Sequence, residues 1–122
     1  MPQISVVLPI YNAAATLATA LDSIAAQTYR DFEVIAVDDG STDETPAILA
    51  RYAGQDERLR VITIEHSGVI VAANTGLRAA GGQLIARMDA ADRMHPERLA
   101  LQADLLADHA DVDVASCLVA GY

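Results

Sequence analysis

Short apolar runs rich in β-branched residues are spaced along the chain at positions 4–8, 32–37, 59–64, 84–88 and 112–119. The first run is apolar at consecutive positions and is bounded by Pro9. Such runs are typical of strands buried on both faces of a parallel sheet. We therefore predict five strands, the first of which begins almost at the N-terminus.

The segments between these runs carry helix signals. Residues on one predicted helix face recur at three- and four-residue steps after each of the first two runs: Leu17, Leu21 and Ile24, then Ile48, Leu49 and Tyr52. Asn12 is placed to cap the first helix, which we expect to end at residues 27–29. Ser41 and Glu44 match a capping box for the second helix, although Pro46 is tolerated only near a helix start.

Two more helices are predicted further along the chain. The third covers residues 69–80 and ends at Gly81 and Gly82. The last opens with Pro96 at its first position and carries Leu99, Leu101, Leu105 and Leu106. Strand and helix thus alternate throughout, which indicates an α/β fold with a mostly parallel sheet, helices on both faces and right-handed crossovers. With no repeat or linker, residues 1–122 are expected to form a single domain.

Composition narrows the class of protein. The 122 residues are 52% hydrophobic, yet no stretch is long and apolar enough to span a bilayer or to serve as a signal peptide, so we expect a cytoplasmic location. A net charge of −9 argues against binding nucleic acid or anionic lipid, because both would be repelled. Cys117 is the only cysteine, which excludes an internal disulfide and a cysteine zinc site; we expect it to be a buried apolar residue.

Two acidic turns carry the strongest chemical signal. Residues 37–41 include Asp38 and Asp39, and residues 88–92 include Asp89 and Asp92; each turn follows a predicted strand. Ligands bind at the carboxyl ends of strands in open α/β sheets, where carboxylates can accept hydrogen bonds from a base or sugar or hold a divalent cation. The alternative is structural, with the aspartates accepting backbone N–H bonds in a turn and helix cap.

Other residues give weaker signals. Tyr11 follows the first strand, where its ring could stack on a base or serve only in packing. His95 is better interpreted as a surface residue than as a metal ligand, and His66 and His109 are expected to face solvent. The chain has no Walker sequence, no spaced glycine fingerprint for dinucleotides and no Gly-x-Ser-x-Gly elbow.

Taken together, these segments resemble the N-terminal half of a family 2 glycosyltransferase of the GT-A fold. The resemblance rests on an ordered set of segments: residues 5–12, 21–24, 27–29, 32–34 and 37–43, then Gly68, Ala72, residues 74–77, Met88, Asp89, Asp92 and residues 96–99. Each segment is weak by itself, but the collinear set is specific and spans nearly the whole chain. It implies a Rossmann-like nucleotide-diphospho-sugar transferase fold, present here as a partial domain.

The resemblance also implies roles for individual residues. Pro9 and Tyr11 would lie beside the uracil, Asp39 would hydrogen-bond the base with support from Asp38, and Asn74 would lie near the nucleotide. The family's Asp-x-Asp motif falls on residues 89–91. Its first aspartate, Asp89, would contact the ribose or sugar, and its last position would bind Mn²⁺ or Mg²⁺ on the diphosphate. A divalent cation stabilises the charge that builds on the leaving diphosphate.

The sequence departs from the family pattern in two ways. Ala91 replaces the expected metal ligand, so Asp92 and Asp89 are the remaining candidates for a shifted or weakened cation site. No general base for the acceptor hydroxyl is present, and in the family that base lies beyond the region matched here. We therefore expect this chain to hold the donor-binding half of an inverting enzyme and to be inactive alone.

The expected partners are a nucleotide-sugar donor, most simply a UDP-sugar, and a glycan or lipid-linked acceptor, with membrane association only in a full-length form. Two other functions stay open: a non-catalytic module that binds a nucleotide or a protein partner, and another phosphate-handling enzyme such as a nucleotidyltransferase. If the sheet normally packs against later elements, the exposed apolar surface would favour homo-oligomers.

Overall fold

The computed structural model describes residues 3–82, 84–101 and 103. Strands and helices alternate along it, in the order β1 (Ile4–Ile10), α1 (Leu17–Ala25), β2 (Phe32–Asp39), α2 (Thr45–Gln55), β3 (Leu59–Ile64), α3 (Val69–Ala79) and β4 (Leu84–Arg87). The strands form a parallel sheet in the order β3-β2-β1-β4. The predicted alternation is therefore confirmed. The fifth predicted strand, His109 and Cys117 lie outside the described residues.

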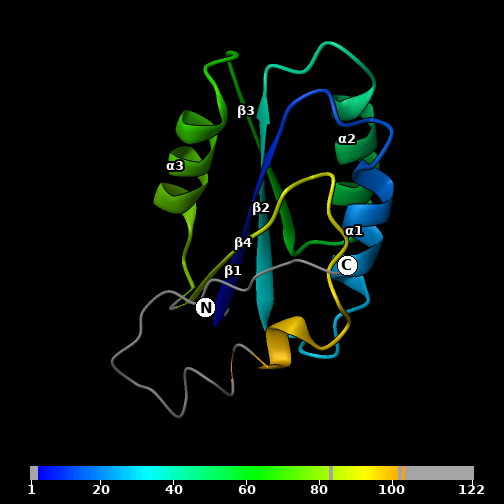
Figure 1. Cartoon of the computed structure of the whole chain (residues 1–122), viewed down its shortest axis with the longest axis vertical. Coiled ribbons are helices and arrows are strands. Elements are labelled where there is room, and N and C mark those ends of the chain that lie inside the picture. The colour runs from blue at the N-terminus through cyan, green and yellow to red at the C-terminus, as the bar shows by residue number, and fades with distance from the viewer. Residues whose placement is uncertain (1–2, 83, 102, 104–122) are drawn as a thin grey trace.

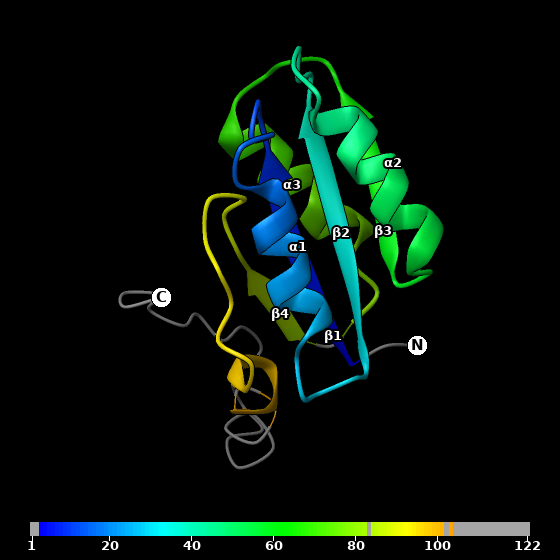
Figure 2. The same ribbon diagram turned by 90° about the vertical axis from the view of Figure 1, so that its right-hand side faces the viewer.

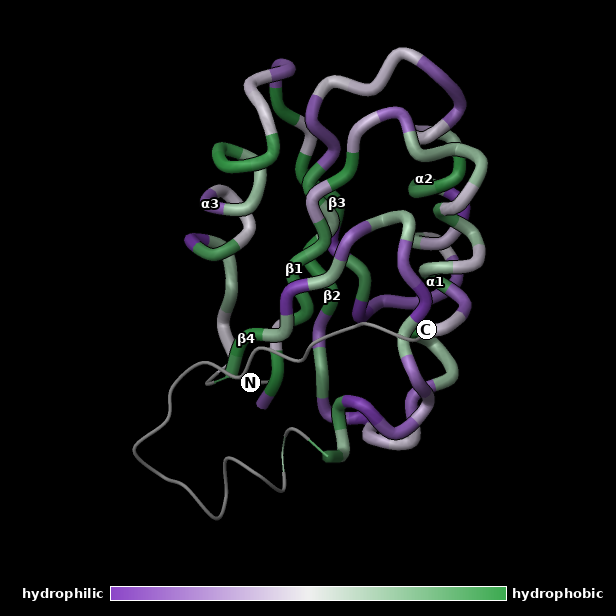
Figure 3. Tube along the Cα trace, in the orientation of Figure 1, coloured by the Kyte–Doolittle hydropathy of each residue, from purple (hydrophilic) through white to green (hydrophobic). Residues whose placement is uncertain are grey.

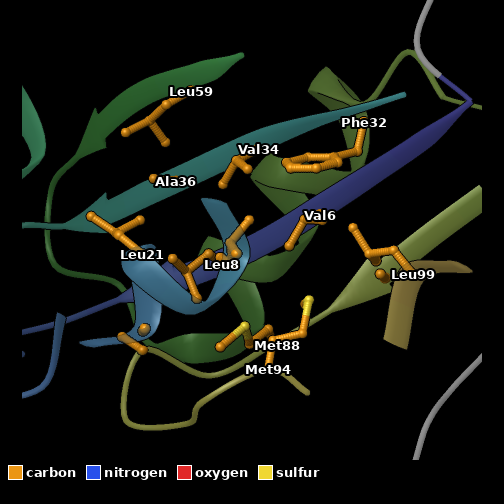
Figure 4. Packing of buried hydrophobic residues seen from close by; sticks show 14 of the residues in the cluster. Val6, Leu8, Leu21, Phe32, Val34, Ala36, Leu59, Met88, Met94 and Leu99 are labelled. Atoms are coloured by element: carbon orange, nitrogen blue, oxygen red, sulfur yellow. The ribbon is translucent and has the colours of Figure 1, made fainter. Parts of the chain in front are cut away.

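Helices cover both faces of the sheet. Helix α3 lies on one side, and α1 and α2 lie on the other (Figures 1 and 2). Figure 3 shows the hydrophobic strands enclosed between these layers. On the α1 and α2 side, Val6 and Leu8 of β1 pack in the main core cluster with Leu21 of α1 (Figure 4). On the other side, Ile35 and Val37 of β2 pack with Ala72 of α3.

Helix α3 turns a face built from small residues toward the sheet. Ala72, Ala73 and Gly76 are its buried positions. A Cβ atom placed on Gly76 would lie 2.6 Å from Cγ1 of Val7, a distance that real contacts do not reach. The absent side chain of Gly76 therefore sets the separation between α3 and β1.

Strands β1 and β2 run two residues further than predicted, to Ile10 and Asp39. Pro9 has no backbone N–H, and it is tolerated inside β1 because no strand needs one there. Its backbone faces the β4 side of β1, and β4 pairs with β1 only as far as Val7. Asp38 and Asp39 are consequently the last residues of β2, and the turn begins at Gly40.

Both predicted helix caps are wrong. Helix α1 begins at Leu17, and Asn12 lies before it in a left-handed conformation with a φ of 46°. Helix α2 begins at Thr45 with Glu44 at the N-cap position and no side-chain cap, so Pro46 falls in its first turn. The side chains of Asn12 and Ser41 are instead used between loops: the N–H of Asn12 donates to Ser41 Oγ, and the N–H of Thr42 donates to Asn12 Oδ1.

The segment after β4 is anchored on the buried side chain of Gln27. Its Nε2 donates to the carbonyl oxygen of His95 at 2.7 Å, and its Oε1 accepts from the N–H of Leu99 at 3.1 Å. The chain turns at Pro96 and is helical from residue 98, so Pro96 precedes the helical residues instead of being the first of them. Leu99 is buried and Leu101 is exposed.

Among the described residues, no helix has the length and apolar character needed to cross a membrane.

Candidate functional site

A pocket of about 210 Å³ opens where β1 and β2 end and α3 begins. It is lined by residues from both strand ends, from the loop after β3 and from the first turn of α3: Pro9, Ile10, Tyr11, Asp39, His66, Gly68, Val69 and Ala72. Three of the residues predicted from the sequence, Pro9, Tyr11 and Asp39, are thus brought together. The carboxyl ends of adjacent parallel strands meet at one sheet edge, which explains why residues far apart in sequence share this pocket.

Asp39 is the buried anion of the pocket, with 2% of its surface exposed. Its Oδ1 accepts the N–H of Ser67 at 2.7 Å, and its Oδ2 accepts the N–H of Gly68 at 3.0 Å. Burial by itself would raise the pKa of this carboxyl, but the hydrogen bonds from Ser67 and Gly68 and the adjacent His66 outweigh burial and lower the pKa. Asp39 is therefore an ionised carboxylate in the lining of the pocket.

Asp38 serves the turn that follows its own strand. Its Oδ1 accepts the N–H of Ser41 at 3.0 Å, and the residue is buried. The two adjacent carboxylates therefore have separate backbone donors, as the structural alternative expected, but Asp39 finds its donors in a different loop from its own. Because Gly68 is the N-cap residue of α3, Asp39 also places a negative charge at the positive end of that helix.

His66 was expected to face solvent without a partner, and that expectation is only half right. The residue is exposed, but its ring stacks on Tyr11 with 4.1 Å between ring centroids and 23° between ring planes. Its Nδ1 lies 3.0 Å from Oδ2 of Asp39. The sequence carried one general signal, because the loops that follow parallel strands all lie at the carboxyl edge of the sheet.

Gly40 holds the backbone of His66 in place. It has a positive φ of 72°, and a Cβ at this position would lie 2.7 Å from the backbone nitrogen of His66. Only glycine combines that conformation with that close approach. The turn after β2 and the loop after β3 are therefore packed backbone against backbone under the pocket.

The second acidic turn lies on the other side of β1, since β4 and β2 both flank that strand. Asp89 is exposed and Asp92 is half-buried, and the N–H of Asp92 donates to the carbonyl oxygen of Asp89. The turn is fixed to the loop before α1 by Thr16, whose hydroxyl donates to the carbonyl oxygen of Ala90 at 3.0 Å. In the described part of the chain, no three acidic, histidine or cysteine residues gather as a ready-made metal site.

Asn74 and a second hollow lie away from this pocket. Asn74 is exposed on α3 and does not line the pocket. A larger hollow of about 530 Å³ lies near the amino ends of β2 and β3, where Arg58 and Asp56 form an ion pair with a 2.9 Å contact. We favour the smaller pocket as the ligand site because it lies at the carboxyl edge of the sheet.

The family model described as Glycosyl transferase family 2 matches residues 5–122. The chain belongs to this family. The resemblance inferred from the ordered motifs is therefore confirmed, and with it the assignment of the chain to the glycosyltransferases.

Curated relatives and solved structures agree with that assignment. The chain is 35% identical over 116 residues to the uncharacterized glycosyltransferase YibD of Escherichia coli, covering 94% of this chain and 33% of YibD. It is 36% identical over 108 residues to the putative teichuronic acid biosynthesis glycosyltransferase TuaG of Bacillus subtilis, covering 88% of this chain and 43% of TuaG. The chain thus spans between a third and a half of the length of these two relatives.

Two solved structures share the fold. Residues 1–349 of S. aureus TarS in complex with UDP superpose with a TM-score of 0.82 at 31% identity, covering 88% of this chain and 33% of that one. The mannosyltransferase PcManGT from Pyrobaculum calidifontis, in complex with GDP-Man and Mn²⁺, gives a TM-score of 0.81 at 34% identity over 88% of this chain and 33% of its own. The described sheet and helices are therefore part of a GT-A glycosyltransferase fold.

Proposed function

We propose that this chain is the donor-binding part of an inverting glycosyltransferase that uses a nucleotide-diphosphate sugar, with UDP as its nucleotide. The observation that carries the proposal is the pocket at the ends of β1 and β2, which combines an exposed aromatic ring, Tyr11, with a buried ionised carboxylate, Asp39. A pyrimidine base offers a flat face for stacking and an N–H for hydrogen bonding, so its chemistry matches both groups.

The remaining residues of the proposed donor site lie in this pocket, on α3 and on the other side of β1. Pro9 forms part of its wall, and Asp38 supports it by fixing the turn after β2. Asn74 is proposed to approach the nucleotide from α3, and Asp89 to approach the ribose or sugar from the other side of β1. Strand β1 lies between β2 and β4, so Asp39 and the turn of Asp89 stand on opposite sides of β1, and neighbouring strands in a sheet are about 4.8 Å apart.

A divalent cation, Mn²⁺ or Mg²⁺, is proposed to bind at Asp89 and Asp92. Within the described residues neither carboxylate accepts a hydrogen bond, so their oxygens are free to coordinate. Magnesium is commonly held by one or two carboxylates together with substrate phosphates, which is compatible with this sparse donor set. When bound, the cation would offset the negative charge on the leaving diphosphate.

In the proposed transfer, an acceptor hydroxyl oxygen attacks the anomeric carbon of the donor sugar. The new carbon–oxygen bond forms as the bond to the diphosphate breaks, and the diphosphate leaves with that electron pair. The hydroxyl proton passes to a general base, which we assign to no residue of this chain. The contribution of Tyr11 and Asp39 is to bind and orient the nucleoside so that the anomeric carbon meets the acceptor.

The test is calorimetric titration of UDP into the chain, in Mn²⁺ and again in EDTA, with GDP as a second ligand. Binding of UDP that is weakened by EDTA supports both the nucleoside pocket and the cation site. Equal binding in both buffers supports the pocket alone. Preference for GDP would overturn the choice of uracil, and the absence of binding by either nucleotide would overturn the proposed function.

A second candidate, a binding-only module of the same fold, is favoured by one observation. Ala91 stands at the position where the resemblance expects a metal ligand, and a methyl group cannot coordinate a cation. Such a module would bind UDP without cation dependence.

A further inference from the structure

The ring of His66 touches two groups that, in the proposed function, bind the base. One face of the Tyr11 ring is covered by the imidazole at 4.1 Å between centroids. Oδ2 of Asp39 lies 3.0 Å from Nδ1 of the same imidazole. A stacking surface and a hydrogen-bond acceptor are what a nucleobase requires, and a single aromatic side chain of the protein uses both.

The hydrogen bond fixes where the proton of His66 lies. Nδ1 faces two acceptors, the carbonyl oxygen of Asp39 at 3.2 Å and its carboxylate oxygen at 3.0 Å. Because neither oxygen can donate, Nδ1 must carry the hydrogen and donate it. His66 therefore presents an aromatic N–H to Asp39, as the N–H of a pyrimidine base would.

The spacing of the two rings leaves no room for a third between them. Stacked carbon atoms are separated by about 3.5 Å, so a base placed between Tyr11 and His66 would need roughly 7 Å between these rings. The observed 4.1 Å is far less. A base that uses this face of Tyr11 must therefore move the imidazole away.

Asp39 is crowded in the same way. A carboxylate offers about four acceptor positions, and the N–H groups of Ser67, Gly68 and His66 already occupy three of them. If the imidazole moved away, the acceptor position on Oδ2 that faces the ring would become free. The two backbone donors would stay in place, so the carboxylate would keep its orientation for the base.

We propose that His66 occupies the base position of the donor pocket when no nucleotide is bound, and that the base must displace it. His66 is thus a residue that sets nucleotide affinity by competition. This inference rests on the proposed function. The displacement needs only side-chain rotation, since 55% of the His66 side chain is exposed while its backbone is packed against Gly40.

The experiment compares the affinity of uridine for the chain and for three His66 variants by calorimetry, with circular dichroism to verify folding. Uridine carries no phosphate, so neither the cation site nor charge repulsion enters the result. His66→Ala removes the ring and the donor. His66→Phe keeps the stacking ring without the N–H, and His66→Asn keeps an N–H donor without the ring. Glu65→Gln, on the exposed preceding residue, is the matched control.

Competition predicts that His66→Ala binds uridine on the order of tenfold more tightly than the unchanged chain, because one hydrogen bond and one ring contact no longer oppose binding. His66→Phe and His66→Asn should fall between the two, and Glu65→Gln should match the unchanged chain. Equal or weaker binding by His66→Ala would overturn the inference and make His66 a group that helps to hold the nucleoside. If neither the unchanged chain nor His66→Ala binds uridine or UDP, the proposed function itself fails.

Discussion

The side chain of Asn12 accepts a hydrogen bond from the backbone N–H of Thr42 at 2.7 Å, which joins the loop after β1 to the loop after β2. The backbone N–H of Asn12 donates in return to Ser41 Oγ at 2.9 Å. Since Tyr11 immediately precedes Asn12, this reciprocal pair helps to set the position of Tyr11 relative to Asp39.

We predict that Asn12→Ala destabilises the chain by about 1–3 kcal/mol, because it loses the bond to Thr42 and places alanine in a left-handed conformation. Asn12→Gly tolerates the conformation and should lose less. Asn12→Asp keeps an acceptor oxygen and should lose least. Chemical denaturation of the three variants measures the order, and equal losses for alanine and glycine would show that the backbone conformation contributes nothing.

Two glycines should respond in opposite directions to alanine. Gly76→Ala should destabilise the chain by about 1–3 kcal/mol, because the new Cβ would lie 2.6 Å from Val7 Cγ1 and α3 would have to move outward. Gly54→Ala lies in α2 with nothing within 4 Å, and should stabilise it by up to about 1 kcal/mol through helix propensity. Thermal denaturation distinguishes them. Adding Val7→Ala to Gly76→Ala should relieve the clash, and no relief would place the strain elsewhere.

The lowered pKa of Asp39 predicts a loss of stability in acid. An aspartate whose pKa is lower in the folded chain than its ordinary value of 3.8 contributes stability that is fully present above that value. The contribution is lost as the pH falls through the lower folded pKa. Asp39→Asn should therefore be less stable at pH 7, and its stability should fall less steeply than that of the unchanged chain below about pH 4. Urea denaturation between pH 2.5 and 7 measures both.

Restoring a carboxylate at position 91 should strengthen cation-dependent binding. Ala91 is exposed, so Ala91→Asp adds a third carboxylate to the turn of Asp89 and Asp92 with little cost to folding. We expect UDP to bind on the order of tenfold more tightly in Mn²⁺ and no more tightly in EDTA. Ala91→Asn adds a side chain of the same shape without charge, and a similar gain in that variant would contradict coordination as the cause.

Much of the fold was predictable because strand-forming runs are local features of the sequence. The ends of the elements were less so. Pro9 and Asp39 are poor strand residues, yet they extend β1 and β2 because pairing across the sheet outweighs their own preferences. Asn12 and Ser41 are residue types that favour helix caps, but the side chain of each accepts a hydrogen bond from the loop that contains the other.

The site shows the same division between local and long-range information. Pro9, Tyr11 and Asp39 lie together because they come at the carboxyl ends of β1 and β2, and parallel strands end at one edge of the sheet. His66 was missed because its partner Asp39 is 27 residues away, and no local pattern records that contact. The sequence also left open whether Asp38 and Asp39 serve structure or ligand, and the hydrogen bonds show that each has a structural donor.

The pocket is lined by residues between Pro9 and Ala72, whereas the second acidic turn comes from a later loop anchored through Thr16 and Ala90. No residue of that turn lines the pocket. Substitutions in the two regions should therefore combine nearly additively. Under the proposed function, a lineage with this architecture loses or regains its dependence on a cation without changing its preference for a nucleoside, because separate stretches of the gene encode the two regions.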